Sequence, residues 1–447
     1  METPVFKNIQ ISPQNISPNG KVSVKDGSSV VSFLVAEVPA LLKASSIRIN
    51  GNIEHLRDGV NVSNLTNSPN LNSNMRCGIY GMIDQIVITS NRSKQVIEHL
   101  KHYSRFISSY KSYTESLENQ LTYKSQTEHT CPNFFLNKTT NIDDKVSADS
   151  DANKNFNSFS FRPITGFLGG ERQINLDGQA GLGGIQIDIH LNSTAQFYNA
   201  IDGTTANTQA EYILRNLSLT GQINPLTPDD INVMMKTPNR TEIFNTYSSY
   251  YQTINSTNGI LNFNLGSSRV KSIWMNFCKS KSLNNFTDDG NATTLPLNSD
   301  GSTADIRSIQ FLRNGTKYPM NYTIDTNFKN DSSVIKLDPQ VIKNGFGAFV
   351  KDGERVHFNS ILMTNSNSRR NYSGIPQINQ QTESGLIYNV GVNYAYTKGG
   401  YADFSGSNLF GVQMDMNLTS NEPNSVFVFV HQENTLVYNK QGLSIMS

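Results

Sequence analysis

The sequence predicts an all-β protein made of two sandwich-like or barrel-like domains. Apolar residues recur with a period of two along many short segments, which is the pattern of half-buried strands. Asn-Gly and Asp-Gly pairs, which favour tight turns, lie between these segments. The length of 447 residues fits two β-rich domains, and many short strands with frequent turns are typical of sandwiches and barrels.

The strand pattern is clearest at 185–191, where aliphatic residues alternate with polar ones. Residues 425–431 are instead continuously apolar, as expected for a strand that is covered on both faces. Further strands are predicted at 30–38, 47–50, 81–89, 158–163, 211–220, 260–264, 270–277, 307–313, 386–396, 412–416 and 434–438. Asn314-Gly315 is predicted to form a tight hairpin turn, because Asn and Gly readily take the positive φ values of a type I′ turn.

One segment, residues 93–123, predicts a long helix. It contains neither Gly nor Pro, and its large apolar residues lie three or four positions apart, with one gap filled by Thr114. The stripe consists of Val96, Leu100, Tyr103, Ile107, Tyr110, Leu117 and Leu121. We expect this helix to pack on the surface of a β-domain. A coiled-coil partner site is the less favoured interpretation, because the seam is imperfect.

A domain boundary is predicted near residues 222–240, which gives one domain at 1–224 and another at 225–447. The sequence GQINPLTPDD has two prolines and paired acids, which we expect to end regular structure. Four long polar loops are predicted as well, and loops of this length are usually functional or mobile. They span 57–76, 136–156, 280–305 and 361–384.

Composition argues against several classes of protein. Lys and Arg number 37 against 36 Asp and Glu, so no general basic surface for nucleic acid is expected. The chain has no apolar run long enough for a transmembrane helix, and its N-terminus lacks the apolar region of a secretory signal. Its three cysteines are too few and too far apart for a disulfide framework. With 55 asparagines, the many Asn-x-Ser/Thr triplets are interpreted as composition rather than glycosylation sites.

No catalytic, cofactor-binding or metal site is predicted. The phosphate-loop, HExxH and GxSxG motifs are absent. The Gly-rich stretch 169–184 precedes a strand instead of following one, so its glycines are interpreted as positions of close backbone approach. Residues 149–155 imitate half of a calcium loop, but Lys154 and Ser160 stand where that loop needs Gly and Glu. Trp274 is interpreted as a core aromatic residue.

Two further pairs of side chains carry groups that could bind a metal or transfer a proton. His129 and Cys131 lack the further ligands that a metal site needs. Asp188 and His190 share the polar face of one predicted strand. They are interpreted as solvated or hydrogen-bonded surface groups rather than a catalytic pair, because no nucleophile is suggested nearby.

The order of the segments resembles that of the major capsid proteins of polinton-like viruses and virophages. The segments of the first half are 45–53, then 81–89 followed by the helical stretch, then 183–191 and 210–219. Those of the second half are 247–277, an Asn-rich loop, 311–319, 385–396 and 424–439. The resemblance covers most of the chain and rests on this order. It implies a double jelly roll, which is two eight-stranded barrels in tandem, with the helical stretch as an insertion.

The same resemblance implies a major capsid protein whose homotrimers tile an icosahedral virion shell. Its implied partners are two further copies, neighbouring capsomers, and penton and minor capsid proteins, and it would be made in the host cell. It implies no enzyme activity and no cofactor. Direct nucleic-acid binding is not expected, because the first 40 residues hold no strongly basic arm. The residues themselves leave two alternatives open: a carbohydrate-binding β-sandwich of an adhesin or fibre, and a polysaccharide-active β enzyme.

Overall fold

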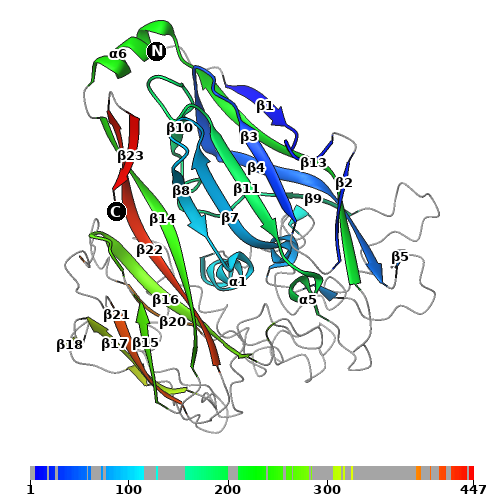
Figure 1. Ribbon diagram of the computed structural model, residues 1–447, viewed down its shortest axis with the longest axis vertical. Coiled ribbons are helices and arrows are strands. Elements are labelled where there is room, and N and C mark those ends of the chain that lie inside the picture. The colour runs from blue at the N-terminus through cyan, green and yellow to red at the C-terminus, as the bar shows by residue number, and fades with distance from the viewer. Residues whose placement is uncertain are drawn as a thin grey trace, which may run out of the picture.

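The structure of the chain is a computed structural model (Figure 1). The residues that it describes are 6–17, 20–25, 29–57, 59–61, 72–73, 77–114, 127–128, 157–199, 210–237, 240–254, 258–263, 265–280, 283, 306–313, 316–317, 324–325, 389–393, 403, 412–418, 424–439 and 442–446. Within these residues the secondary structure is mostly antiparallel strand, with few helices.

The strands that begin before residue 225 form three sheets. The largest has the order β1-β13-β4-β10, with β2 paired to β13 and with β5 and β9 paired to β4. Its strands are β1 (Lys7–Ile11), β2 (Lys21–Val24), β4 (Ala40–Arg57), β5 (Val60–Asn61), β9 (Asn157–Phe161), β10 (Gln173–Asn175) and β13 (Ala210–Pro225). The second sheet has the order β3-β11-β7-β8, formed by β3 (Val30–Val35), β7 (Ile83–Ser90), β8 (Val96–Leu100) and β11 (Ile185–Leu191). The third pairs β6 (Asn72–Ser73) with β12 (Tyr198–Asn199).

The strands that begin after residue 225 form two further sheets. One has the order β14-β22-β16-β20, with β23 paired to β22. Its strands are β14 (Arg240–Ile254), β16 (Val270–Lys279), β20 (Asn389–Asn393), β22 (Asn424–Asn439) and β23 (Gly442–Met446). The other has the order β15-β21-β17-β18, with β19 paired to β17. Its strands are β15 (Asn258–Phe263), β17 (Ile306–Arg313), β18 (Thr316–Lys317), β19 (Ile324–Asp325) and β21 (Val412–Leu418).

The same strand order occurs twice along the chain. In the first half, the early strand β1 pairs with the last long strand β13, which also pairs with β4. In the second half, β14 pairs in the same way with β22, which also pairs with β16. The second sheet of each half repeats this nesting, since β3 pairs with β11 and β15 pairs with β21. Two antiparallel sheets of nested strands are the architecture of a jelly roll. The predicted all-β fold of two tandem jelly rolls is therefore confirmed.

Strand β11 shows why the period-two pattern was informative. Its residues alternate between buried and half-buried along its whole length, with Ile185, Ile187, Ile189 and Leu191 buried. The aliphatic side chains face the core, and the intervening polar side chains face outward. The strands predicted in this half are all present within the described residues.

Strand β22 is buried on both faces, as its continuous apolar sequence predicted. Val428 is paired with Tyr250, whose ring lies 5.3 Å from that of Phe263 on β15, so this face points into the second jelly roll. Phe427 and Phe429 alternate with the valines and therefore point away from that sheet. The predicted strands 425–431 and 434–438 are one continuous strand, since β22 runs through residues 432 and 433 and pairs with β14 along its length.

The long helix predicted at 93–123 is wrong over its first turns. Residues 96–100 form strand β8, which pairs with β7, and the helix α1 (Tyr103–Thr114) begins only after them. Val96 is half exposed whereas Ile97 is buried, so the apparent helical stripe does not mark the buried face of this segment. Pairing with β7 outweighed the helical spacing, because secondary-structure preference is weak against tertiary contacts. Residues 115–123 lie outside the described part of the chain.

Other helices fall where none was expected. The segment that was predicted to end regular structure contains helix α6 (Pro228–Lys236), whose first residue is proline. Thr227 and Asp230 form a reciprocal capping box around its first turn. Proline is well tolerated at this position because the amide that it lacks would have had no partner within the helix. Two short turns, the 3-10 helix η2 (Gly78–Met82) and α5 (Thr194–Phe197), complete the described helices.

The hairpin predicted at Asn314-Gly315 is supported by the strands around it. Arg313 on β17 pairs with Thr316 on β18, so two residues join the paired strands. The turn residues themselves lie outside the described part, as do most residues of the four predicted long loops. The first of those loops, 57–76, contains β5 and β6.

Candidate functional site: the contact between the two halves

The two halves of the chain meet along a buried contact. We call the residues up to 224 the N-terminal half and the rest the C-terminal half. Figure 1 shows the two sets of sheets side by side, with β14 and β22 running next to β8 and α1. One continuous hydrophobic core includes side chains of both halves. This contact fixes the position of one jelly roll against the other.

Glu98 on β8 lies at the centre of this contact and is buried. Its Oε1 atom accepts hydrogen bonds from the amides of Gly166, at 3.0 Å, and Tyr247, at 2.9 Å. Its Oε2 atom accepts one from the amide of Phe167 at 2.7 Å. Tyr247 belongs to β14, so one carboxylate ties a loop of the N-terminal half to a strand of the C-terminal half.

Close backbone packing and amide hydrogen bonds determine the environment of the Glu98 carboxylate. A Cβ atom on Gly166 would lie 2.5 Å from the carbonyl oxygen of Asn245, so β14 can approach this loop only because residue 166 has no side chain. Burial raises the pKa of the Glu98 carboxyl, and the three amide hydrogen bonds oppose that shift. A buried carboxylate without such donors would be costly, so this arrangement favours a single docked geometry.

Aromatic rings fill the contact beside Glu98. Phe106 on α1 lies 4.9 Å from Tyr247 on β14 and 5.5 Å from Phe429 on β22, measured between ring centroids. Tyr110, one helical turn after Phe106, stacks on it at 5.1 Å and reaches Tyr247 at 5.9 Å. The spacing of four residues puts both rings on the same face of α1. This is how the helix joins the two halves.

A second group of side chains extends the contact along β22. The guanidinium of Arg105 lies 4.3 Å from the ring centre of Phe427, which is a cation–π geometry. The ring of His102 lies 4.9 Å from Phe427 and 5.7 Å from Tyr251. His102 has a φ of 54°, which turns the chain between β8 and α1. Burial lowers the pKa of His102 to about 4, so its imidazole is neutral at physiological pH.

One ion pair and one hydrogen bond to a backbone carbonyl also join the two halves. Arg172 lies 2.9 Å from Glu242 on β14, and its guanidinium lies 4.6 Å from the ring of Phe167. Arg240 donates to the carbonyl of Ala180 at 2.8 Å. Glu242 and Ala180 each lie in the opposite half from the arginine that they bind, so the contact combines apolar packing with directional bonds. Such an interface resembles the inside of a domain rather than a transient encounter.

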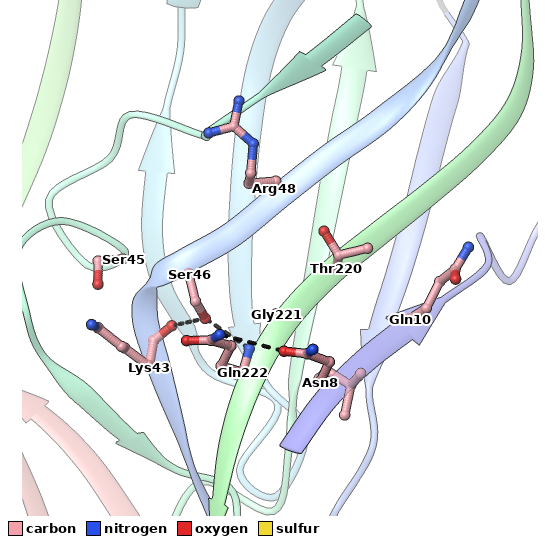
Figure 2. A pocket seen from close by; sticks show the side chains of 10 residues that line it. Asn8, Gln10, Lys43, Ser45, Ser46, Arg48, Thr220, Gly221 and Gln222 are labelled. Atoms are coloured by element: carbon pink, nitrogen blue, oxygen red, sulfur yellow. Dashed lines mark hydrogen bonds between the residues drawn. The ribbon is translucent and has the colours of Figure 1, made fainter. Parts of the chain in front are cut away.

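A polar depression of about 690 Å³ lies on the outer face of β1, β13 and β4 (Figure 2). Two cross-strand rows line it, one made of Asn8, Gln222 and Lys43 and the other of Gln10, Thr220 and Arg48. The register of β13 against β4 shifts between Thr220 and Gln222, where β4 bulges. Ser46 fixes this bulge, because its hydroxyl accepts from the Gln222 amide at 2.8 Å and donates to the Lys43 carbonyl at 2.6 Å.

The sequence matches no family model and no curated protein, but solved structures with a similar fold are found. The Faustovirus major capsid protein aligns with a TM-score of 0.58 and 8% identity, over 97% of this chain and 90% of that one. The PBCV-1 virus capsid gives 0.55 and 10% identity, over 100% and 97%. The Sputnik virophage structure gives 0.55 and 11% identity, over 100% and 89%.

This chain has the double jelly-roll fold of viral capsid proteins. The alignments extend over nearly the whole of each chain, so the relationship includes both jelly rolls and their order. It agrees with the resemblance that the order of segments suggested. No helix in the described part of the double jelly roll is both long and apolar enough to cross a membrane.

Of the residues weighed as candidate sites, the structure describes Asp188 and His190, which both lie on β11. Asp188 is half-buried, and the amide of Gln186 donates to both of its carboxylate oxygens at 3.0 Å, as a hydrogen-bonded surface group should. His190 lies on the same strand, opposite Val30 and Gln85. Among the described residues, no cluster of three or more His, Cys, Asp or Glu side chains is placed to hold a metal ion.

The Gly-rich stretch has the structural role that was predicted. Gly184 has a φ of +87°, and a Cβ atom there would lie 2.4 Å from the carbonyl oxygen of Val35, so the backbones do approach closely. His129, Cys131 and residues 149–155 lie outside the described part of the chain, and so does the side chain of Trp274. The predictions for these residues remain predictions.

The important residue that sequence reasoning missed is Glu98. It was overlooked because the surrounding segment was interpreted as a helix, in which a Glu between apolar positions is an ordinary surface residue. Burial along β8 follows no period of two, since both Ile97 and Glu98 are buried. No local pattern therefore marks Glu98, and its role depends on two segments that are distant in sequence.

Proposed function

We propose that this chain is a major capsid protein whose trimers form the capsomers of an icosahedral virion shell. The observation that carries the proposal is the repeated jelly-roll topology with a buried contact between the two halves. Two barrels held rigidly in each chain make six barrels in a trimer. Six barrels approximate a hexagon, which can tile a surface. The fold relationship to viral capsid proteins supports the same function.

The finer features of this proposal follow from the same reasoning. The two domains are 1–224 and 225–447, each one jelly roll. The partners of the chain are two further copies, neighbouring capsomers, and penton and minor capsid proteins, and its location is the virion. The role is structural, without catalysis or a cofactor. A net charge of +1 limits repulsion between subunits in a crowded lattice.

A sugar-binding adhesin or fibre protein was the alternative. Carbohydrate sites usually present an exposed aromatic platform to the sugar ring. The depression on β1, β13 and β4 is lined by amide, hydroxyl and cationic side chains and by Ile9, with no aromatic residue among them. This lining gives the adhesin no specific support, so the capsid function is the one that we propose.

The test is the mass of the purified protein in solution, combined with negative-stain imaging. Multi-angle light scattering should give about 149 kDa, three times the 49.7 kDa of one chain. Images should show hexagonal particles of one size or shells built from them. The trimer should persist on dilution, because an obligate interface of this kind buries more than about 2,000 Å². A folded monomer that stays at 49.7 kDa at micromolar concentration would contradict the proposal.

A further inference from the structure

Three polar side chains from three neighbouring strands of the C-terminal half meet at one point. β22 lies between β14 and β16 in their sheet (Figure 1). Asn245 on β14 and Glu433 on β22 are direct cross-strand partners. The Nζ atom of Lys271 on β16 lies 2.6 Å from Oε1 of Glu433 and donates a hydrogen bond to Oδ1 of Asn245 at 3.0 Å. One amine therefore contacts a carboxylate and a side-chain amide at the same time.

A bulge in β16 directs Lys271 to this position. The register of β16 against β22 shifts between Val270 and Ser272, so Lys271 is the extra residue of the bulge. Such a residue can aim its side chain where a regular strand would not. The other carboxylate oxygen of Glu433 lies 3.9 Å from Arg269, which leaves Oε1 to the lysine. The side chains of Lys271 and Glu433 are each 22% exposed, so the pair is partly withdrawn from water.

We propose that Lys271 and Asn245 react to form an isopeptide bond within the chain, with Glu433 as the proton carrier. A lysine amine is a nucleophile once it has lost its proton. The carbonyl carbon of Asn245 is bonded to the oxygen that Nζ already contacts, so nucleophile and electrophile are neighbours. Amides react very slowly with amines in free solution, and holding the two groups together in the fold can supply a large part of the barrier.

The reaction needs no reagent beyond these three side chains. The Glu433 carboxylate takes a proton from the Lys271 ammonium, and the neutral amine attacks Cγ of Asn245. A bond forms between Nζ and Cγ, and the bond between Cγ and Nδ2 breaks. One of the three ammonium protons stays on the new amide. The other two pass through Glu433 to the leaving nitrogen, which departs as ammonium, so the carboxylate is regenerated. The group reacts once, and the product is a covalent link rather than a turnover.

The bond would join β14 to β16 across the strand between them. β14 is the strand that docks on the N-terminal half, because the amide of Tyr247 donates to Glu98 and the carbonyl of Asn245 lies against Gly166. A covalent link at Asn245 would therefore fasten the docked strand to its own barrel. This inference concerns a modification of the chain and does not depend on the proposed capsid function.

A second lysine–asparagine contact provides an internal control. The Nζ atom of Lys94 donates to Oδ1 of Asn91 at 2.6 Å, three residues away in an exposed segment. In the part of the chain that the structure describes, no ion pair joins Lys94 to a carboxylate. Without a proton carrier this lysine should keep its charge and stay unreacted.

The first test is mass spectrometry of the purified, folded full-length protein. Its intact mass should be lower than that of the sequence by one ammonia. Trypsin does not cleave after an acylated lysine, so residues 270–279 should be recovered joined to residues 241–269. A succinimide at another asparagine also loses ammonia, so the branched peptide is the deciding product. Complete cleavage after Lys271 with residues 241–269 unbranched, or a branched peptide that joins Lys94 to Asn91 equally well, would overturn the proposal.

The second test separates the roles of the three side chains. Lys271→Arg keeps the positive charge beside Glu433 but supplies no reactive amine, so the branched peptide should disappear. Glu433→Gln keeps both reacting groups and should lower the linked fraction at least tenfold. Glu54→Gln breaks a different ion pair, to Arg215, and should leave the linked fraction unchanged. A Glu433→Gln protein that is linked as fully as the wild type would refute the role of the carboxylate. If a variant does not fold, the peptides of the wild-type protein decide.

Discussion

The side chain of Glu98 accepts a hydrogen bond from the main-chain amide of Tyr247, 149 residues later in the chain, at 2.9 Å. This one bond joins the edge strand of the first jelly roll to the first strand of the second. Because the donor is a backbone amide, the bond fixes the position of β14 whatever side chains surround it. Together with Gly166 and Phe167 it sets the relative position of the two barrels, which a rigid capsomer needs.

We expect Glu98→Gln to destabilise the protein by about 1–3 kcal/mol. The substitution keeps the size of the side chain but replaces one acceptor oxygen with a donor NH2 group. At least one of the three amides would then be buried without an acceptor. Urea denaturation at pH 7 measures the loss, with the exposed Glu37→Gln as a control that should change stability little. Equal stability of Glu98→Gln and the wild type would show that the bonds contribute nothing.

Phe106→Ala should remove a buried aromatic ring from the contact between the halves. The ring is buried and touches aromatic side chains of both β14 and β22, so its loss leaves a cavity. Truncating a buried Phe typically costs about 3–5 kcal/mol. In calorimetry we expect a lower melting temperature and a split into two transitions, as the halves begin to unfold separately.

Val96→Ala is the control for that experiment, because Val96 is 50% exposed on the neighbouring strand. Its effect should stay within about 0.5 kcal/mol. A single sharp transition for Phe106→Ala at the wild-type temperature would mean that α1 does not couple the two halves.

The fold was largely predictable from the sequence because burial on one face leaves a period of two. Ile187 and Ile189 on β11 are buried for that reason, and such strands were found. Helix α6 was missed because Pro228 and the paired acids were interpreted as breakers. The same residues start a helix well when Thr227 precedes them, since Thr, Pro and Asp all favour the first turn.

The contact between the halves could not be predicted in the same way. Phe429 belongs to a run whose apolarity indicated two covered faces, but the sequence does not say what covers the second face. Glu98 gave no signal at all, because its donors are backbone amides of residues 166, 167 and 247. A polar residue whose partners are main-chain atoms in distant segments leaves no pattern in its own neighbourhood.

Thr227→Ala should loosen helix α6 without unfolding the protein. The hydroxyl of Thr227 accepts from the Asp230 amide at 3.2 Å, and this capping interaction is worth about 0.5–2 kcal/mol to a helix. None of the nine residues of α6 is buried, so the helix depends on its caps rather than on packing. Amide hydrogen exchange should accelerate in α6 alone. Thr237→Ala, at the other end, is the control and should leave the first turn protected.

His102 should make the stability of the contact depend on pH. Its imidazole packs against Phe427 and Tyr251, and burial lowers its pKa to about 4 from an ordinary value of 6.5. Asp84 works against the shift, whereas the positive charges of Arg105 and Lys101 add to it. The unfolded chain therefore takes up the proton first as the pH falls. The stabilisation is fully present above pH 6.5 and is lost progressively as the pH decreases toward 4.

Between pH 7.5 and pH 5 the wild-type protein should lose roughly 2 kcal/mol through this one group, at about 1.4 kcal/mol per pH unit below 6.5. His102→Asn removes the titration and keeps a residue that tolerates the φ of 54°. The variant should accordingly lose less stability than the wild type over the same range, as measured by urea denaturation at each pH. Direct NMR titration of the ring proton should give a midpoint near 4. A midpoint near 6.5, or identical pH profiles for the two proteins, would show that His102 is not buried against Phe427 in solution.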